Sequence, residues 1–236
     1  MTSLINNQSP MKMARIAGVT YLVLYLAGMF AEFFVRSSLY VQGDASATAS
    51  NIMDSELLFR WGITSDVVMI ISDITLAVIF YVLFKPVSHY LSTFAAFFRM
   101  TQASILGVNL LNLFIILHLL SGAEYLSSFS NEQLHSLVMT FVHAHDVGYS
   151  IGLIFFGVSL LFFGILVMKS AYVPKVLGFM LIIASIGYFV DSFAKILMHD
   201  YEKYAAIFDS VVFMPAAIAE MAFILWLLIK GVNVTK

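Results

Sequence analysis

The stretch GYSIGLIFFGVSLLFFGILVM, residues 148–168, contains no charged side chain. A helix needs about 20 predominantly apolar residues to cross the hydrocarbon core of a bilayer. Helices are the expected spanning structure, because no water is available there to satisfy an open backbone. The stretch therefore predicts a membrane-spanning helix, and with the residues before it the span runs over roughly 134–168.

Five further stretches meet the same criterion, and the composition agrees with them. Of the 236 residues, 61% are hydrophobic and 11% are charged, and the mean hydropathy is +0.94, whereas soluble domains are about half apolar and about a quarter charged. The predicted fold class is an all-α integral membrane bundle, in which residues 1–236 form a single six-span domain. The spans are expected at roughly 15–36, 60–84, 92–120, 134–168, 175–197 and 208–230.

Two compositional features exclude classes of function. The chain has no cysteine, so disulfides, thiol nucleophiles and thiolate metal sites are excluded. A net charge of -2 and the lack of a basic run give nucleic-acid binding no electrostatic support. The expected partner is the lipid bilayer, with a small polar ligand or a lipid as a second one. The sequence identifies neither a cofactor nor an oligomeric state.

Lysine and arginine predict the orientation, because cytoplasmic loops carry an excess of them. The outer loops hold only Arg36, Arg60 and Lys203. Both termini are therefore expected in the cytoplasm, in a multi-pass protein of the cell (cytoplasmic or inner) membrane. In the first outer loop, Asp44 is expected to cap a short amphipathic helix over residues 45–54. The basic residues of the expected cytoplasmic side are Lys12, Arg15, Lys85, Lys169, Lys175, Lys230 and Lys236.

Polar residues inside the spans are the candidates for function, as in the stretch FVHAHDVGYS, residues 141–150. A charge in the hydrocarbon costs about 2.5–3.5 kcal/mol on insertion scales, so such residues pair or mark a pathway. Depths estimated from the helical rise place polar groups of five spans at one level, which predicts a polar cavity near the outer face. Its expected ligand-binding or proton-handling residues are Glu32, Arg36, Arg60, Asp66, Asn109, His145, Tyr149 and Asp191.

A second, smaller group is expected deeper in the membrane. Asp73 and Arg99 coincide in depth, so they are predicted to form an interhelical ion pair that holds two spans together. Glu220 is placed nearer the midplane. Asp191 and Lys195 stand four residues apart, which fits either a local salt bridge or a role in the site.

The spacing of the two histidines of "HAHD" argues against a shared metal ion. His143 and His145 point about 200° apart around a regular helix, whereas a metal-binding helix uses residues four apart. His145 and Tyr149 share one face and are the preferred interior pair; His143 and Asp146 share another. No metal site and no catalytic residue is identified, and no Walker loop, GxGxxG or haem-attachment motif is present.

Ordered blocks over about residues 13–233 resemble a known family. They include ARIAGVTYLVLYLAGMFAEFFVRSSL, GDASATASNI, LFRWGI, FRMTQASILGVNLLNL, HDVGYSIGLIFFG, PKVLGFMLIIASIGYFVDSF and AEMAFILWLLIKGVN. The chain resembles multi-pass proteins classed as domain of unknown function 4386, which implies a bacterial or archaeal inner-membrane protein and carries no activity. His143 does not match the family pattern. The matching polar positions are Glu32, Arg36, Arg60, Asp66, Arg99, Gln102, Asn109, His145, Tyr149, Asp191 and Glu220.

Three functions remain open. The leading hypothesis is that the outer cavity binds or transports a small polar ligand, a lipid head group or protons. In it, Arg36, Arg60 and Lys195 attract an anion, and Asp66 and His145 titrate. The second is an intramembrane enzyme, a metal-assisted hydrolase or lipid-modifying protein, which requires three such groups to converge. The third is a structural or partner protein whose polar residues are all mutually paired.

Overall fold

The computed structural model describes residues 9–232, and Lys236 lies outside the described residues. Six helical segments are long and apolar enough to cross a membrane. No strand occurs between residues 9 and 232. The predicted all-α bundle of six membrane-spanning helices is therefore confirmed. The spans are Pro10–Leu39, Glu56–Phe84, His89–Leu119, Asn131–Lys169, Lys175–Leu197 and Ala205–Ile229.

The first and last spans are each assembled from several helical pieces. The elements are α1 (Pro10–Met29), the π-helix η1 (Phe30–Arg36), α2 (Ser37–Leu39), α3 (Ala45–Asp54), α4 (Glu56–Phe84), α5 (His89–Leu119), the 3-10 helix η2 (Glu124–Leu126), α6 (Asn131–Lys169), α7 (Lys175–Leu197), the 3-10 helix η3 (Tyr201–Tyr204), α8 (Ala205–Phe208), the π-helix η4 (Asp209–Phe213) and α9 (Met214–Ile229).

The helix ends follow local sequence signals. Asp44 caps α3 by accepting a hydrogen bond from the backbone of Ala47, so the short helix predicted over residues 45–54 is present. Ser130 and Gln133 form a capping box at the start of α6. Pro215 falls in the first turn of α9, directly after η4. Because proline has no N–H to continue the regular ladder, the last span is irregular just before this residue, where η4 is π-helical.

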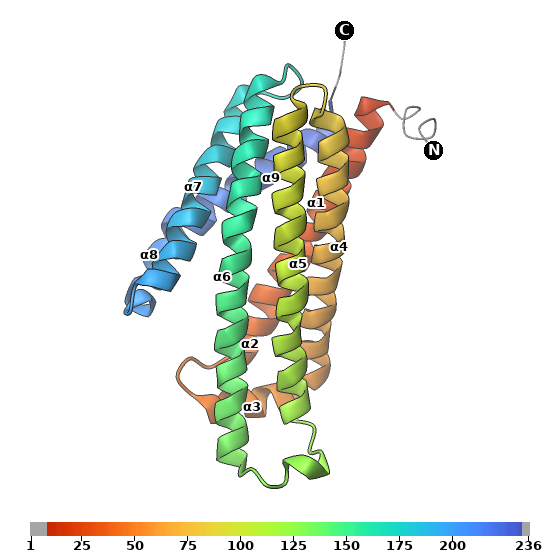
Figure 1. Ribbon diagram of the computed structural model, residues 1–236. Coiled ribbons are helices and arrows are strands. Elements are labelled where there is room, and N and C mark those ends of the chain that lie inside the picture. Colours follow the sequence, from red (N-terminus) through yellow and green to blue (C-terminus); the bar gives the residue numbers. More distant parts are fainter. Residues whose placement is uncertain (1–8, 233–236) are drawn as a thin grey trace.

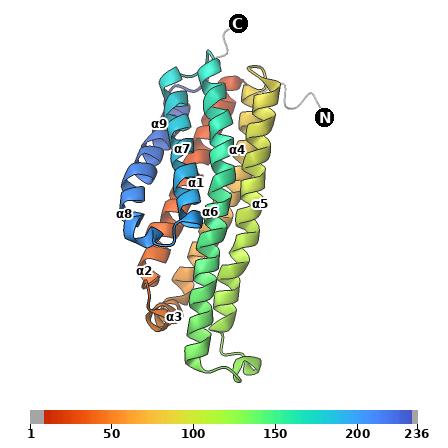
Figure 2. The ribbon, with the colours of Figure 1, turned by 60° about the vertical axis from the view of Figure 1, so that its left-hand side comes forward.

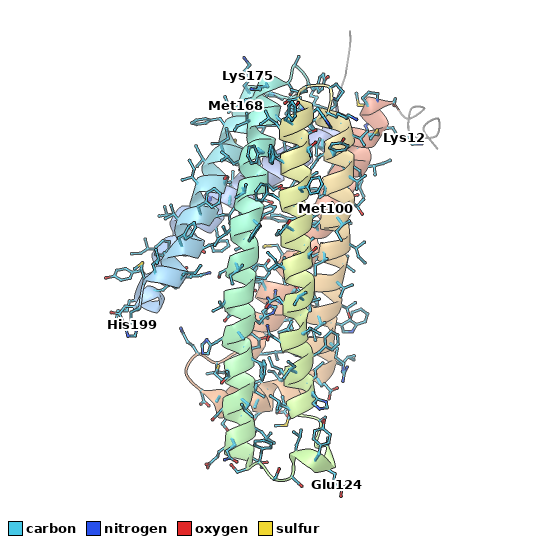
Figure 3. The ribbon with its side chains drawn as sticks, viewed as in Figure 1. Lys12, Met100, Glu124, Met168, Lys175 and His199 are labelled. Atoms are coloured by element: carbon cyan, nitrogen blue, oxygen red, sulfur yellow. The ribbon has the colours of Figure 1, made fainter. Side chains whose placement is uncertain are left out.

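The spans form a closed ring. Each packs against its neighbours in the chain, and α9 returns to pack against α1. The start of α1 and the end of α9 lie at one end of the bundle with Lys12 and Lys175, which we call the terminal end (Figure 1, Figure 3). Helix α3 (Figure 1) and Glu124 (Figure 3) lie at the other, which we call the distal end.

Helices α6 and α7 approach closely through two glycines. A Cβ atom added at Gly164 would lie 2.9 Å from the carbonyl oxygen of Gly178, and one at Gly178 would lie 2.8 Å from that of Gly164. Small residues let helices pack in a bilayer, where no hydrophobic force drives them together. The glycines of α6 at positions 148, 152, 157 and 164 all face helices of the same chain.

Helix α7 is shorter than α6, and it ends partway along it. Figures 1 and 2 both show α7 and α8 stopping well short of the distal end, which α5 and α6 reach. Around the distal part of the bundle, large apolar side chains such as Phe34 and Leu57 point outward, as lipid-facing residues do. The apolar core has two parts: one in the terminal half around Phe80, Phe163 and Phe223, and a smaller one in the distal half.

Candidate functional site

Arg36 and Asp66 form a buried ion pair in the distal half of the bundle. Arg36 is the last residue of η1, and its Nη1 lies 2.7 Å from Oδ2 of Asp66 on α4. On its other side, Nε of Arg36 donates to the carboxylate of Glu32 at 2.8 Å. The side chain of Glu32 is 55% exposed, whereas that of Asp66 is 2% exposed. The guanidinium is therefore held between two carboxylates, one buried and one open to the surroundings.

The helix carrying Arg36 is irregular at this point. The backbone N–H of Ser37 donates to the carbonyl of Glu32, five residues before it, in place of the regular spacing of four. The hydroxyl of Ser37 donates to the same carbonyl at 2.9 Å. Single π-helical turns inside α-helices frequently occur at functional sites. The first span thus departs from regular geometry over the residues that supply the ion pair.

His145 is buried on α6 and is held by Asn109 of α5. The Asn109 amide donates to the backbone carbonyl of His145 at 2.9 Å, and the same Nδ2 lies 3.1 Å from Nδ1 of the imidazole. Asn112 in turn donates to Oδ1 of Asn109 at 2.9 Å. Nδ1 lies closer to this amide than to the backbone carbonyl of Asn109, which is 3.5 Å away, so we assign Nδ1 as the acceptor and the proton of the neutral imidazole to Nε2.

The contact between the Asn109 amide and His145 depends on a glycine of α6, Gly148. A Cβ atom added at Gly148 would lie 2.1 Å from Oδ1 of Asn109. Only glycine therefore lets the Asn109 amide approach α6 closely enough to reach His145. The stretch that contains His145 in the sequence also contains the glycine that positions its partner.

Two buried polar atoms beside the ion pair have no hydrogen-bond partner among the described residues. They are Nε2 of His145 and the hydroxyl of Tyr40, the residue that follows α2. The charges of Arg36 and Glu32 act on both side chains. Burial raises the pKa of Tyr40, so its hydroxyl keeps its proton and can donate. We call Glu32, Arg36, Tyr40, Asp66, Asn109 and His145 the Arg36 network.

Tyr149 belongs to the surroundings of this network. Its ring lies 6.2 Å from that of His145 between centroids, one turn further along α6. The charges of Arg36 and Asp66 act on its hydroxyl. His145 and Tyr149, which sequence reasoning paired on one face of the helix, are thus neighbours on the inward side of α6.

Three predicted or neighbouring polar residues lie on the outside instead. Arg60 is exposed and pairs with Glu56 at 2.7 Å, one turn away on the same helix. His143 and Asp146 share an exposed face of α6. The charges of Glu32, His143, Arg36 and Lys195 all act on the Asp146 carboxyl. The structure therefore turns Arg60 away from the network and sets Asp146 at its border.

A second buried network lies in the terminal half. Arg99 of α5 pairs with Asp73 of α4, with 2.6 Å between Nη2 and Oδ1. Glu220 of α9 accepts hydrogen bonds from the hydroxyls of Tyr21 at 2.8 Å and of Tyr188 at 2.7 Å. The Arg99 guanidinium lies 5.3 Å from the ring centre of Tyr21, which joins the two parts. With Gln102 beside Asp73, we call these six residues the Glu220 network.

Asp191 is fully buried but belongs to neither network. Its carboxylate accepts a hydrogen bond from Tyr201 at 2.5 Å and lies 3.3 Å from Nζ of Lys195, four residues further along α7. The Lys195 ammonium also lies over the rings of Tyr201 and Phe213. These contacts make Asp191 part of the junction between the end of α7 and the last span.

Comparison with known proteins places the chain in one family. Residues 16–231 match the family described as domain of unknown function (DUF4386). The chain belongs to this family. It is also 34% identical over 163 residues to an uncharacterized protein from Archaeoglobus fulgidus, an alignment that covers 69% of this chain and 79% of the relative. No solved structure matches the chain.

Membership in the DUF4386 family confirms the resemblance seen in the sequence and assigns no chemistry. Among the side chains that the structure describes, no group of three or more His, Asp or Glu residues is arranged to hold a metal ion. The six helices place the protein in a lipid bilayer as a multi-pass integral membrane protein.

Sequence reasoning missed the tyrosines of both networks. Tyr21 and Tyr188 donate to Glu220, and Tyr40 lies beside Arg36. Tyrosine is common in membrane helices, so its presence alone is a weak signal. Depth gives a stronger one, because Tyr21 lies eleven residues inside the start of α1 and Glu220 lies nine residues before the end of α9. At about 1.5 Å per residue, the two side chains fall at similar levels.

Proposed function

We propose that the protein binds a small polar ligand at the Arg36 network, in the distal half of the bundle. The observation that carries this proposal is the pair of buried, unpartnered atoms beside the ion pair, Nε2 of His145 and the hydroxyl of Tyr40. A buried polar group without a partner costs about 1–3 kcal/mol. Two such groups next to one ion pair are explained by a ligand or ordered water that pairs with both.

The charges favour a ligand with a positive group. Each cation that the sequence offered to an anion is already paired: Arg36 with Glu32 and Asp66, Arg60 with Glu56, and Lys195 with Asp191. One guanidinium between two carboxylates leaves the network one positive charge short, and Asp146 at its border adds a further acid.

The hydrogen-bonding groups add a second requirement. The Tyr40 hydroxyl and the Nε2–H of His145 donate, so they call for an acceptor oxygen on the ligand. An ammonium group next to an oxygen acceptor, as in ethanolamine or the head group of phosphatidylethanolamine, meets both needs. A proton carried by a bound water would meet only the first of these requirements, the positive charge.

The position of the network supports a membrane-related role. Glu32 reaches the surroundings from the first span while Asp66 lies fully inside the bundle, so the ion pair joins an exposed group to a buried one. Polar groups that face the interior of a bundle mark ligand and ion pathways. The bias of lysine and arginine supports placing the terminal end in the cytoplasm and the Arg36 network toward the outer leaflet of the cell membrane.

A purely structural role accounts less well for the same contacts. Polar residues that only join helices are expected to satisfy one another, as the hydroxyls of Ser159 and Ser185 do by donating to backbone carbonyls of neighbouring helices. Asn109 contacts His145 at its backbone carbonyl and at Nδ1, and yet Nε2 has no partner among the described residues. Holding a ring in place while one of its nitrogens remains unpaired is typical of a binding residue.

Thermal-shift measurements on the purified protein test the proposal. Ethanolamine, choline and phosphatidylethanolamine in mixed micelles are the amine probes, and acetate and inorganic phosphate are the anionic controls. We expect an amine to raise the unfolding temperature of the wild type and not of Asp66→Asn or His145→Ala. Asp191→Asn is the matched control, because it removes a buried carboxylate outside the network and should keep the shift. Equal shifts in all four proteins would refute the proposal.

A further inference from the structure

The Glu220 carboxyl is held in an unusual way for a buried acid. It is 5% exposed, and both of its oxygens accept hydrogen bonds from tyrosines, one on α1 and one on α7. Neither tyrosine carries a positive charge. A buried charge normally requires a paired cation in addition to hydrogen bonds. Tyr21 and Tyr188 therefore orient this carboxyl without neutralising it.

The charged groups around Glu220 do not neutralise its carboxyl either. The charged and titratable groups that act on Glu220 are Tyr21 on α1, Asp73 on α4, Arg99 on α5 and Tyr188 on α7, and Tyr25 is near it on α1. Helix α6 contributes the ring of Phe156, which contacts Arg99 and Tyr188. Arg99 is already paired with Asp73. One arginine against two carboxyl groups leaves the Glu220 network one positive charge short.

An unpartnered acceptor points to the same deficit. Gln102 is 4% exposed and lies one turn after Arg99, and its side chain interacts with the Asp73 carboxylate. Its Oε1 has no donor within the described part of the chain. A proton bound to a carboxyl of the network would supply the missing positive charge and would add a hydroxyl donor.

A small cavity lies on the terminal side of Arg99. Its volume is about 10 Å³, and Arg99, Ser92, Ser159 and Tyr81 contribute the polar part of its lining. That volume is about the minimum for one water molecule. Ser92 lies in the first turn of α5, next to the loop at the terminal end. The cavity therefore lies between Arg99 and the terminal end of α5.

We propose that the Glu220 network is a second binding site, which takes up one proton from the terminal end of the bundle. The proton is shared among the carboxyls of Asp73 and Glu220, and water in the cavity beside Arg99 carries it in and out. A metal cation fits less well, because the oxygens of Glu220 already accept two hydrogen bonds and hard cations need about six oxygen ligands. This site goes beyond the ligand site at Arg36 and does not depend on it.

Infrared spectroscopy of the full-length protein in lipid tests the proposal directly. A protonated carboxyl has its own C=O stretching band, which shifts on exchange into heavy water. We expect the wild type to show such a band, and Glu220→Gln or Asp73→Asn to abolish or displace it. Asp66→Asn and Asp191→Asn are the controls and should leave it unchanged, so failure of the Arg36 ligand site would not affect this result. A spectrum unaltered by both Glu220→Gln and Asp73→Asn would overturn the proposal.

Two milder substitutions keep the test decisive if Glu220→Gln fails to fold. Tyr188→Phe removes one hydrogen bond to the carboxyl and should shift the frequency of the same band. Ala96→Leu should fill the cavity beside Arg99 and slow exchange of the carboxyl proton into heavy water. A band that neither moves in Tyr188→Phe nor exchanges more slowly in Ala96→Leu would contradict a site reached through this cavity.

Discussion

The side-chain amide of Asn109 holds both the backbone and the ring of His145. Its Nδ2 lies 2.9 Å from the carbonyl oxygen and 3.1 Å from Nδ1, across the contact between α5 and α6. One residue thereby fixes the position of the imidazole, and we assign the ring proton to the opposite nitrogen, Nε2. The proposed ligand site depends on Nε2, which has no partner among the described residues.

Asn109→Ala should destabilise the fold by about 1–3 kcal/mol, because it leaves buried polar atoms of His145 without a partner. The change in the free energy of unfolding is measured by titrating a denaturing detergent into mixed micelles that contain the protein. Asn112→Ala is the control, since Asn112 is half-buried and donates only to the Asn109 side chain. Equal losses in the two variants would show that Asn109 has no special role in holding His145.

Breaking the ion pair between Arg36 and Asp66 should lower the stability of the fold by more than Asn109→Ala does. Arg36→Ala should cost about 3–5 kcal/mol, because it strands a buried carboxylate. Replacing both partners by apolar residues, Arg36→Met with Asp66→Leu, should restore most of that stability. Arg60→Ala, which breaks an exposed pair, should change it by less than about 1 kcal/mol. If Arg36→Ala and Arg60→Ala lowered the free energy of unfolding equally in the same assay, the claim that the Arg36–Asp66 pair is buried would be refuted.

Two glycines of facing helices provide a matched comparison. Gly148→Ala should be strongly destabilising, because its Cβ would overlap Oδ1 of Asn109 and push α5 and α6 apart. Gly107→Ala on α5 meets no atom within 4 Å, so it should be neutral or stabilising by up to about 1 kcal/mol. Thermal unfolding of the two variants is the measurement, and a neutral Gly148→Ala would refute the close approach at Asn109.

The orientation can be tested without background, because the chain has no cysteine. Ser127→Cys, in the exposed distal loop, should react in intact cells with a maleimide that cannot cross the membrane. Ala171→Cys, exposed in the loop between α6 and α7 at the terminal end, should react only after the membrane is opened. The reverse labelling pattern would place the terminal end outside the cell.

The six-span architecture was predictable because each membrane span corresponds to a long, mostly apolar run in the sequence. The stretch at residues 148–168 sufficed for one span, and the caps at Asp44 and Ser130 are local signals that the structure retains. The extra length of the first span was missed, since the π-helix η1 carries Glu32 and Arg36 outward as an internally paired unit. Periodicity alone does not show that a charged segment continues a helix.

The polar contacts were only partly accessible from the sequence. Depth along a helix is read from residue counts, and Asp73 and Arg99, matched by depth, lie in contact. Rotation about the helix axis is less well defined, which is why Arg60 was grouped with residues from which it points away. The tyrosines around Glu220 depend on the closing of the ring between α9 and α1, and that tertiary contact has no local signal.

The most direct test of the ligand site is an experimental density map of the protein in lipid nanodiscs, at a resolution that shows bound water. The map should contain density of water or ligand within hydrogen-bonding distance of the Tyr40 hydroxyl and of Nε2 of His145. Added ethanolamine should extend that density toward Asp66 or Glu32. A map in which both side chains pair with protein groups, with no density between them, would contradict the proposed function.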